Sequence, residues 1–367
     1  MPTAPDVIIV GGGVVGAACA RELARAGHRV RLIDRGNESG EAWRVSAGLL
    51  SPQIDARTSD PLFELGIAGR EYWREQAPGL RESTGVDVDL WEGGILEIAV
   101  SERDVNHLKE MVAWQRQHGH RCEWLDADEV RREWPWLGVT AGGLHAPHDG
   151  SVDPVRAVEA LRADAARLGA ELVTDTVTGL TRGSGRVTGV QGHERHAGGH
   201  VVVAAGAWSG RLGNLPRPLS VEPVRGQIAT YPWPDGARPG IVLGHDVYLL
   251  HRRGEALAGS TLEHAGFDAS VTEDGLASIH ARAEKLVPAL AHARRTRARA
   301  GLRPGTPDGL PIIGREPNLD GLWYATGHGR HGVLLAGITG VIIGHLMAGE
   351  ATFEEVSALK PERFWSW

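Results

Sequence analysis

The sequence predicts an α/β protein of two domains, and three observations lead to this expectation. The chain opens with a strand, a glycine-rich turn, a helix and a second strand, all within residues 6–34. Helical and strand-like stretches then alternate along the chain, which is typical of sheets covered by helices. The length of 367 residues exceeds what one compact core usually supports, so a second domain is expected.

The opening unit reads as two parallel strands joined by a helix. Residues 6–10 are almost wholly apolar, as in a strand that is buried on both faces. The helix that follows carries apolar residues at helical spacing, and Gly27 ends it. Residues 29–33 form the second strand, which ends in Asp34. The pattern therefore predicts a βαβ unit.

The remaining elements follow from the same periodicities. The expected helices cover residues 60–76, 102–118, 154–168 and 272–287. The expected strands lie within residues 86–100, 171–174, 187–190 and 200–206, and in the strand-rich stretch 223–262. Residues 333–348 are almost wholly apolar but shorter than a bilayer span and rich in glycine, so they predict a buried helix. The N-terminal domain is expected to be interrupted by insertions.

The glycines of the first turn form a G-x-G-x-x-G motif between a strand and a helix. In such a motif Gly11 makes the tight turn, Gly13 lets the backbone approach a pyrophosphate, and Gly16 lets the helix lie close to the strand. The N–H groups near Val14 and Val15 would bind the phosphates. The motif predicts a dinucleotide site.

Asp34 completes this fingerprint at the end of the second strand. Its carboxylate would accept hydrogen bonds from ribose hydroxyls, which disfavours a cofactor with a 2′-phosphate. NAD and FAD share the fingerprint, so the motif leaves the choice between them open.

Three further segments favour FAD over NAD. They are VVVAAGAWS over 201–209, AGLRPGTPDGLPIIG over 300–314 and TGHGRHGVLL over 326–335. With them the chain resembles the glycine oxidase and D-amino-acid oxidase family of FAD enzymes, closest to the glycine oxidases of thiamine-thiazole synthesis. The resemblance runs from end to end. It implies an α/β fold with a discontinuous Rossmann-like FAD-binding domain and a substrate domain with a mixed, largely antiparallel sheet.

The resemblance also implies how the chain is divided and how the cofactor is held. The FAD-binding domain is expected to comprise residues 1–80, 145–220 and 297–367. The substrate domain is expected to comprise residues 81–144 and 221–296. FAD is expected to be non-covalent, because neither Cys19 nor Cys122 lies near the C-terminal motifs.

Carried over position by position, the resemblance implies a set of FAD contacts. These are Gly11, Gly13, Val14, Val15, Gly16, Asp34, Arg35, Ala42, Trp43, Ser46, Ala47, Gly48, Leu49, Val177, Gly206, His328, Gly329, Arg330, His331, Gly332, Val333 and Leu334. The last seven would lie beneath the flavin ring, where backbone N–H groups stabilise the negative charge of reduced flavin.

Arg303 and Arg330 match the substrate-carboxylate arginines of the family, and Tyr248 matches a tyrosine that assists them. Arginines in such apolar and glycine-rich surroundings need an anion or a partner, and a surface ion pair is the alternative. The implied reaction oxidises glycine, sarcosine or a small D-amino acid to a 2-oxo acid. It uses molecular oxygen and releases ammonia or an amine and hydrogen peroxide.

Two other functions fit the same motifs. One is an FAD-dependent dehydrogenase of N-methyl or D-amino acids that passes electrons to a quinone or a protein, and the other is a non-catalytic flavin-binding protein. The substrate also stays open, because Gly329 replaces an aromatic of the family, His331 replaces an asparagine, and Asp246 stands where a histidine can occur. The missing aromatic predicts an enlarged pocket.

Several other partners and sites are not expected. The net charge of −7 argues against nucleic acid. His193, His196 and His200 resemble a metal triad but are expected to be solvated residues of a polar turn, so no metal is predicted. The start of the chain lacks the pattern of a signal peptide, which favours a cytoplasmic protein without membrane contact. A homo-oligomer is compatible with the sequence.

Overall fold

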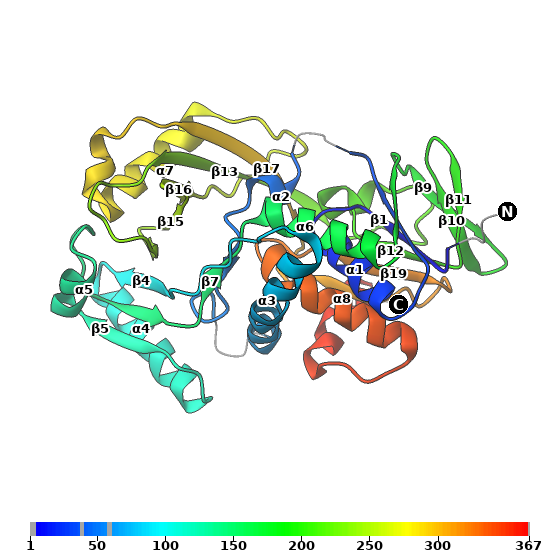
Figure 1. Ribbon diagram of the computed structural model, residues 1–367, viewed down its shortest axis with the longest axis horizontal. Helices are drawn as coiled ribbons and strands as arrows, with labels where there is room; N and C mark the ends of the chain where they lie inside the picture. The colour runs from blue at the N-terminus through cyan, green and yellow to red at the C-terminus, as the bar shows by residue number, and fades with distance from the viewer. Residues whose placement is uncertain (1–4, 37–39, 57–60, 366–367) are drawn as a thin grey trace.

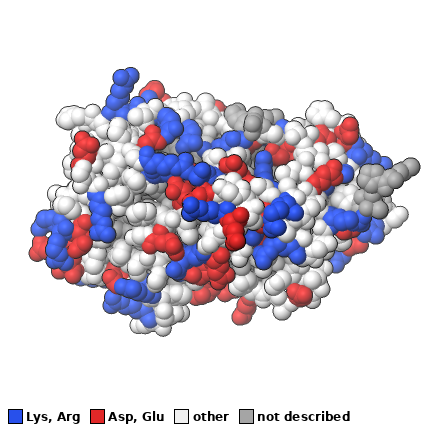
Figure 2. Space-filling model, in the orientation of Figure 1, with Lys and Arg blue, Asp and Glu red and all other residues white. Residues whose placement is uncertain are grey.

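The computed structural model describes residues 5–36, 40–56 and 61–365 (Figure 1). Two large sheets lie at opposite ends of an elongated molecule, one with the N-terminal βαβ unit and the other with α7 (Glu273–Leu286). Acidic and basic side chains are mixed over the face seen in Figure 2. The expected α/β class with two kinds of sheet is confirmed.

The first large sheet has six strands, and its neighbours come from distant parts of the chain. Its order is β18 (Ile312–Arg315), β19 (Leu322–Thr326), β12 (His200–Val203), β1 (Val7–Val10), β2 (Val30–Asp34) and β8 (Glu171–Thr174). All neighbouring strands are parallel except β18 and β19. The N-terminal strand β1 therefore lies in the centre, beside strands that follow long insertions.

Both faces of this sheet are covered. The helices α1 (Val14–Arg25), α3 (Leu62–Thr84), α6 (Pro154–Arg167) and α8 (Gly332–Ala348) share one core with the sheet. On the other face lies a three-stranded antiparallel sheet of β9 (Gly179–Gly183), β10 (Arg186–Gln191) and β11 (Arg195–Ala197). Val7 belongs to the helical core and Ile8 to the opposite one, so β1 is buried on both faces as its apolar sequence predicts.

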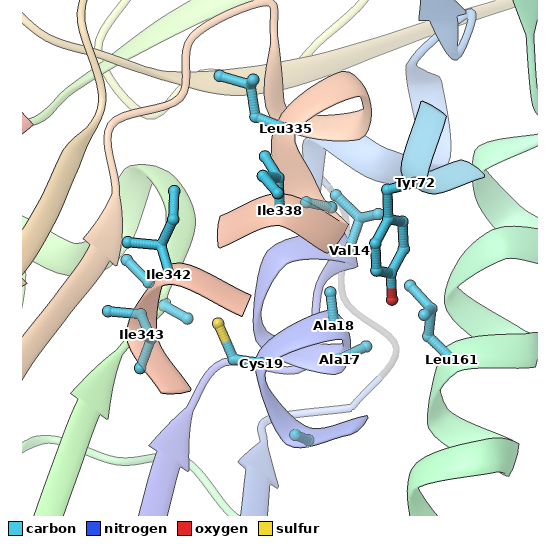
Figure 3. Packing of buried hydrophobic residues seen from close by; sticks show 14 of the residues in the cluster. Val14, Ala17, Ala18, Cys19, Tyr72, Leu161, Leu335, Ile338, Ile342 and Ile343 are labelled. Carbon is cyan, nitrogen blue, oxygen red and sulfur yellow. The ribbon is translucent and has the colours of Figure 1, made fainter. Parts of the chain in front are cut away.

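The apolar helix α8 belongs to the helical layer, where it packs against α1 and α3 (Figure 3). Small residues such as Ala18 and Cys19 on α1 let α1 and α8 approach closely. A Cβ on Gly340 of α8 would lie 2.9 Å from the Ala18 carbonyl oxygen. The prediction of a buried helix is thereby confirmed. In the described parts of the chain, no helix is both long and apolar enough to span a bilayer.

The second large sheet has eight strands and is mixed but largely antiparallel, as expected. Its order is β17 (Arg297–Gly305), β13 (Glu222–Pro232), β16 (Glu255–Gly259), β15 (Val247–Arg252), β14 (Ile241–Gly244), β4 (Ile95–Ala99), β6 (Gly142–Ala146) and β5 (Glu123–Asp126). Only the pairing of β14 with β4 is parallel among these strands. Helix α7 packs on one face, and α4 (Glu102–Gln117) packs on β4 to β6.

Short elements complete the fold. They are α2 (Ala42–Val45), β3 (Leu49–Leu50), β7 (Gly150–Ser151), α5 (Ala127–Glu133), and the 3₁₀ helices η1 (Gly206–Arg211), η2 (Pro288–His292), η3 (Glu354–Leu359) and η4 (Pro361–Phe364). The residue boundaries expected for the two domains stay a prediction.

Three sequence-based expectations need correction. The helix expected over 60–76 runs from Leu62 to Thr84, and Asp60 lies outside the described residues. It continues through Pro78 because burial of Leu80 in the helical core outweighs the cost of an internal proline. The strand expected over 200–206 ends at Val203. His196, expected to be solvated, is 7% exposed, because it bonds to a buried carboxylate beneath β11.

Candidate active site

One cavity of about 430 Å³ extends between the two large sheets. Its walls come from the β1–α1 turn, the end of β2, the segment 41–51, η1, β15, β17 and the start of α8. The structure brings together in this cavity every residue expected to bind cofactor or substrate, with the exception of Gly16.

The β1–α1 turn is built by close backbone approach. Gly11 has φ +98°, and a Cβ there would lie 2.5 Å from the Ala204 carbonyl oxygen. A Cβ on Gly16 would lie 1.8 Å from the Gly11 carbonyl oxygen, so Gly16 acts by letting α1 approach β1. Helix α1 has no side-chain cap and no acidic residue in its first turn. Its N–H groups and positive dipole end therefore face the cavity near Gly13 and Val14.

Asp34 ties this turn to the end of β2. Its Oδ2 accepts from the Gly12 N–H at 2.7 Å, and its Oδ1 accepts from the Gly36 N–H at 3.0 Å. Arg162 lies 3.5 Å from Oδ1. A carboxylate has about four acceptor positions, so Asp34, which lines the cavity, retains capacity for ribose hydroxyls.

The segment 175–177 closes the end of the cavity next to β2. Val177 lines it as the family resemblance implies. Asp175 is buried, and its oxygens accept from His193 Nδ1 at 2.6 Å and from His196 Nε2 at 2.8 Å. The histidines thus orient a carboxylate, and among the described residues no group of His, Cys, Asp and Glu is suited to hold a metal.

Several cavity residues have no counterpart in the sequence-based prediction. The most distinctive are Glu41, Asp55, Asp175, Trp208, Arg211 and Ser260. The Arg35 guanidinium lies 3.8 Å from the centre of the Trp208 ring, so Trp208 supports a residue that the sequence did indicate. Trp208 lies within the segment 201–209 that indicated FAD, whereas no local motif marks the other five residues, which reach the cavity through packing between distant segments.

The loop before α8 forms the far wall. His328 is buried, its Nε2 lies 3.0 Å from Thr339 Oγ1, and burial lowers its pKa from 6.5 to about 3, with the nearby His331 as a lesser cause. His328 is therefore neutral. Helix α8 has neither a side-chain cap nor an acidic residue in its first turn, so its positive end faces the cavity at Gly332 and Val333. The Trp73 indole N–H donates to the Val333 carbonyl at 2.8 Å and holds this end in place.

Arg303 projects from β17 into a partly buried position with neutral partners. It donates through Nη2 to Ser260 Oγ at 2.7 Å and through Nη1 to the Thr261 carbonyl at 3.0 Å. Among the residues that the structure describes, no carboxylate lies within 4 Å of it. Burial lowers its pKa, which shows that the charge is poorly solvated. A cation in this position is arranged to receive an anion.

Tyr248 lines the cavity from β15. Burial raises its pKa to about 12, and the charge of Arg303 only partly offsets the rise. The phenol therefore keeps its proton and is able to donate a hydrogen bond at neutral pH.

Arg330 differs from Arg303, although the family resemblance groups them. Its side chain is 56% exposed, and its Nη2 lies 3.1 Å from Asp55 Oδ1. The neighbouring Gly329 has φ +53°, and a Cβ there would meet no atom within 4 Å. A side chain at this position would therefore have room, and the enlarged pocket stays a prediction. Asp246 is exposed and does not line the cavity.

The donor set of the cavity fits a flavin dinucleotide. Two uncapped helix ends, at α1 and α8, offer backbone N–H groups for a pyrophosphate and for an electron-rich ring, and Asp34 offers acceptors for a ribose. Fold and site together define a flavin-dependent oxidoreductase.

The family follows from comparison with known proteins. The family model described as DAO, FAD dependent oxidoreductase, matches residues 6–346, which is more than half of the chain, so the chain belongs to this family. Its cofactor is FAD, as predicted from the C-terminal motifs.

Similar proteins span the whole chain. A glycine oxidase of Geobacillus kaustophilus is 35% identical over 95% of this chain and 94% of its own. A glycine oxidase of Pseudomonas aeruginosa is 37% identical over 94% of each chain. The crystal structure of the G. kaustophilus glycine oxidase superposes with a TM-score of 0.93, covering 99% of this chain and 100% of that one at 33% identity.

Proposed function

We propose that the chain catalyses the FAD-dependent oxidative deamination of glycine or a small amino acid, such as sarcosine or a small D-amino acid. The products would be a 2-oxo acid, ammonia or an amine, and hydrogen peroxide. The observation that carries the proposal is Arg303, a partly buried cation with only neutral partners in the cavity wall beside Tyr248. The glycine oxidases that resemble the chain over almost its full length support the same substrate class.

In this proposal Arg303 binds the substrate carboxylate through its remaining N–H groups, and Tyr248 donates a further hydrogen bond. Ser260 and the Thr261 carbonyl hold the guanidinium in one orientation. A carboxylate anchored at this point fixes the position of the adjacent Cα, which lowers the entropic cost of reaction. No side-chain base is required when the amine binds in its neutral form.

FAD bound in the cavity would supply the redox chemistry, taking a hydride from the substrate Cα and passing electrons to molecular oxygen. The N–H groups at Gly332, Val333 and Leu334 present a positive potential there, which favours negative charge that develops during the reaction. The neutral His328 adds no competing charge at this wall. Water then hydrolyses the oxidised substrate, an imine, to the 2-oxo acid.

The proposal is tested on purified protein. Acid should release FAD into the supernatant, because neither Cys19 nor Cys122 is among the described residues that line the cavity. Glycine, sarcosine and D-alanine should each be added without oxygen, and at least one should bleach the flavin. Admission of oxygen should then restore the absorbance and produce peroxide.

Two results would redirect the proposal. Bleaching without peroxide would indicate a dehydrogenase that uses a quinone or a protein acceptor. A flavin that no amino acid reduces would indicate a non-catalytic flavin-binding protein. We further propose that the enzyme is cytoplasmic and forms a homo-oligomer, which light scattering would detect. The family resemblance implies that its product supplies thiamine-thiazole synthesis.

A further inference from the structure

A buried polar network holds the segment 51–55 against the cavity. Asp149 is fully buried, and its Oδ2 accepts from the N–H groups of Gln53 and Ile54, each at 3.0 Å. Its Oδ1 lies 2.8 Å from Nη1 of the buried Arg70. The Gln53 side chain bonds to Gln115 at 3.0 Å. Because a buried polar group without a hydrogen bond is costly, this network fixes the backbone of the segment.

The segment ends at Asp55, whose carboxylate lines the cavity. The Asp55 N–H donates to the Ser51 carbonyl at 2.9 Å, and the Ser51 hydroxyl donates to Asp55 Oδ2 at 2.9 Å. The other carboxylate oxygen lies 3.1 Å from Arg330 Nη2, and His331 Nε2 lies 3.9 Å from Oδ2. The position of this carboxylate is therefore set by the protein itself.

Asp55 changes the charge of the substrate end of the cavity. Among the described residues of this end, Arg303 and Arg330 contribute two positive charges and Asp55 one negative charge, which leaves one net positive charge for a ligand. The pairing is one-sided, because Asp55 lies beside Arg330 while Arg303 has only neutral partners. An ion pair as exposed as Asp55–Arg330 contributes little to folding stability, so its loss in a variant should leave the fold intact.

We propose that Asp55 is a specificity-determining residue that matches the pocket to substrates with a single carboxylate. By neutralising Arg330 it leaves Arg303 as the cation that binds the carboxylate, and it repels a second acidic group on the ligand. Specificity of this kind comes from a repulsive element as well as from an attractive one. The inference rests on the proposed function, since it assumes that an amino-acid carboxylate enters this cavity.

The first test compares acetate with malonate as ligands of the FAD-loaded protein, with Kd measured from the change in flavin absorbance. Asp55→Asn should raise the preference for malonate over acetate by at least about tenfold, because a negative charge next to the second carboxylate is lost. The matched control is Asp128→Asn, which removes one charge from an exposed ion pair with Arg131 on α5 and should leave the ratio unchanged. An unchanged ratio in Asp55→Asn would overturn the proposal.

The second test is a double-mutant cycle. Arg330→Gln leaves the Asp55 carboxylate beside the pocket without this arginine, so acetate should bind about tenfold more weakly. Asp55→Asn combined with Arg330→Gln restores the original net charge and should return the acetate Kd to within about threefold of the wild type. A double variant that binds acetate as weakly as Arg330→Gln would show that Arg330 itself binds the carboxylate.

These measurements need no turnover. A wild type that binds carboxylates but oxidises no amino acid would defeat the proposed function while leaving the test of Asp55 intact. A protein that oxidises glycine, with an unchanged malonate-to-acetate ratio in Asp55→Asn, would defeat the inference alone.

Discussion

The two ends of the cavity are built in different ways. At the dinucleotide end the glycine turn and Asp34 come from one βαβ unit, residues 7–34, and the segment 175–177 and Trp208 complete the wall. At the substrate end each group comes from a different element: Tyr248 from β15 and Arg303 from β17. Arg330 comes from the loop before α8, and Asp55 from the segment before α3. The glycine turn and Asp34 form within one local unit of the chain. The substrate end, in contrast, forms only after distant segments have packed.

This difference has a consequence for how mutations should act. Changes at the dinucleotide end should alter cofactor affinity and folding together, because backbone geometry serves both. Changes at the substrate end should alter turnover while the cofactor stays bound.

The largest effect is expected for Arg303→Ala. Loss of a charge-assisted bond to a desolvated carboxylate typically costs about 2–5 kcal/mol, so kcat/KM should fall by roughly tens- to thousands-fold while the FAD content is unchanged. Arg297→Ala on the same strand β17 removes an exposed arginine paired with Glu255 and serves as the control. Normal kinetics in Arg303→Ala, measured by peroxide production, would place the carboxylate elsewhere.

At the opposite end, Gly16→Ala should weaken folding and FAD binding together. The added Cβ would lie 1.8 Å from the Gly11 carbonyl oxygen, and overpacking of this kind costs about 1–3 kcal/mol. Gly79→Ala in α3 is the matched control, since its Cβ would meet nothing within 4 Å. The effect is measured as the denaturant midpoint of unfolding and as the Kd for FAD. Equal values of both in wild type and Gly16→Ala would mean that the turn tolerates a side chain.

His328 links the wall of the cavity to pH. Its pKa lies at about 3 in the folded chain because burial disfavours the charged form, against 6.5 when it is exposed. Between these values the unfolded chain binds one more proton, so stability should fall as pH falls, by up to about 1.4 kcal/mol per pH unit. His328→Gln should reduce this slope, measured by urea unfolding between about pH 4.5 and 6.5. An equal slope in both proteins would show that other groups cause the acid sensitivity.

The smallest effect concerns the open side of the substrate end. Gly329→Tyr should lower kcat/KM for sarcosine and D-alanine relative to glycine by roughly tenfold, because one methylene in an apolar pocket is worth about 1–3 kcal/mol. Gly329→Ala shares the cost of a side chain at φ +53° but lacks the ring, so it separates strain from pocket filling. Should the tyrosine leave the ratio unchanged, position 329 does not limit substrate size.

The sequence alone predicted much of the fold. The βαβ unit, the buried helix predicted over 333–348 and the strand-rich stretch 223–262 follow from periods of apolar residues and from turn residues, which act over a few positions. The correction at α3 arose where burial of Leu80 overrode the local signal of Pro78.

At the site, the sequence predicted the glycine turn and the position of Asp34, because glycine spacing and the end of β2 are local properties of the chain. It also indicated Arg303, Arg330 and Tyr248 through motifs that the family shares. Only the tertiary structure decided that Arg303 has neutral partners while Arg330 is paired with Asp55. The charge that a pocket offers depends on which distant side chains come within a few ångströms, and no local pattern encodes that distance.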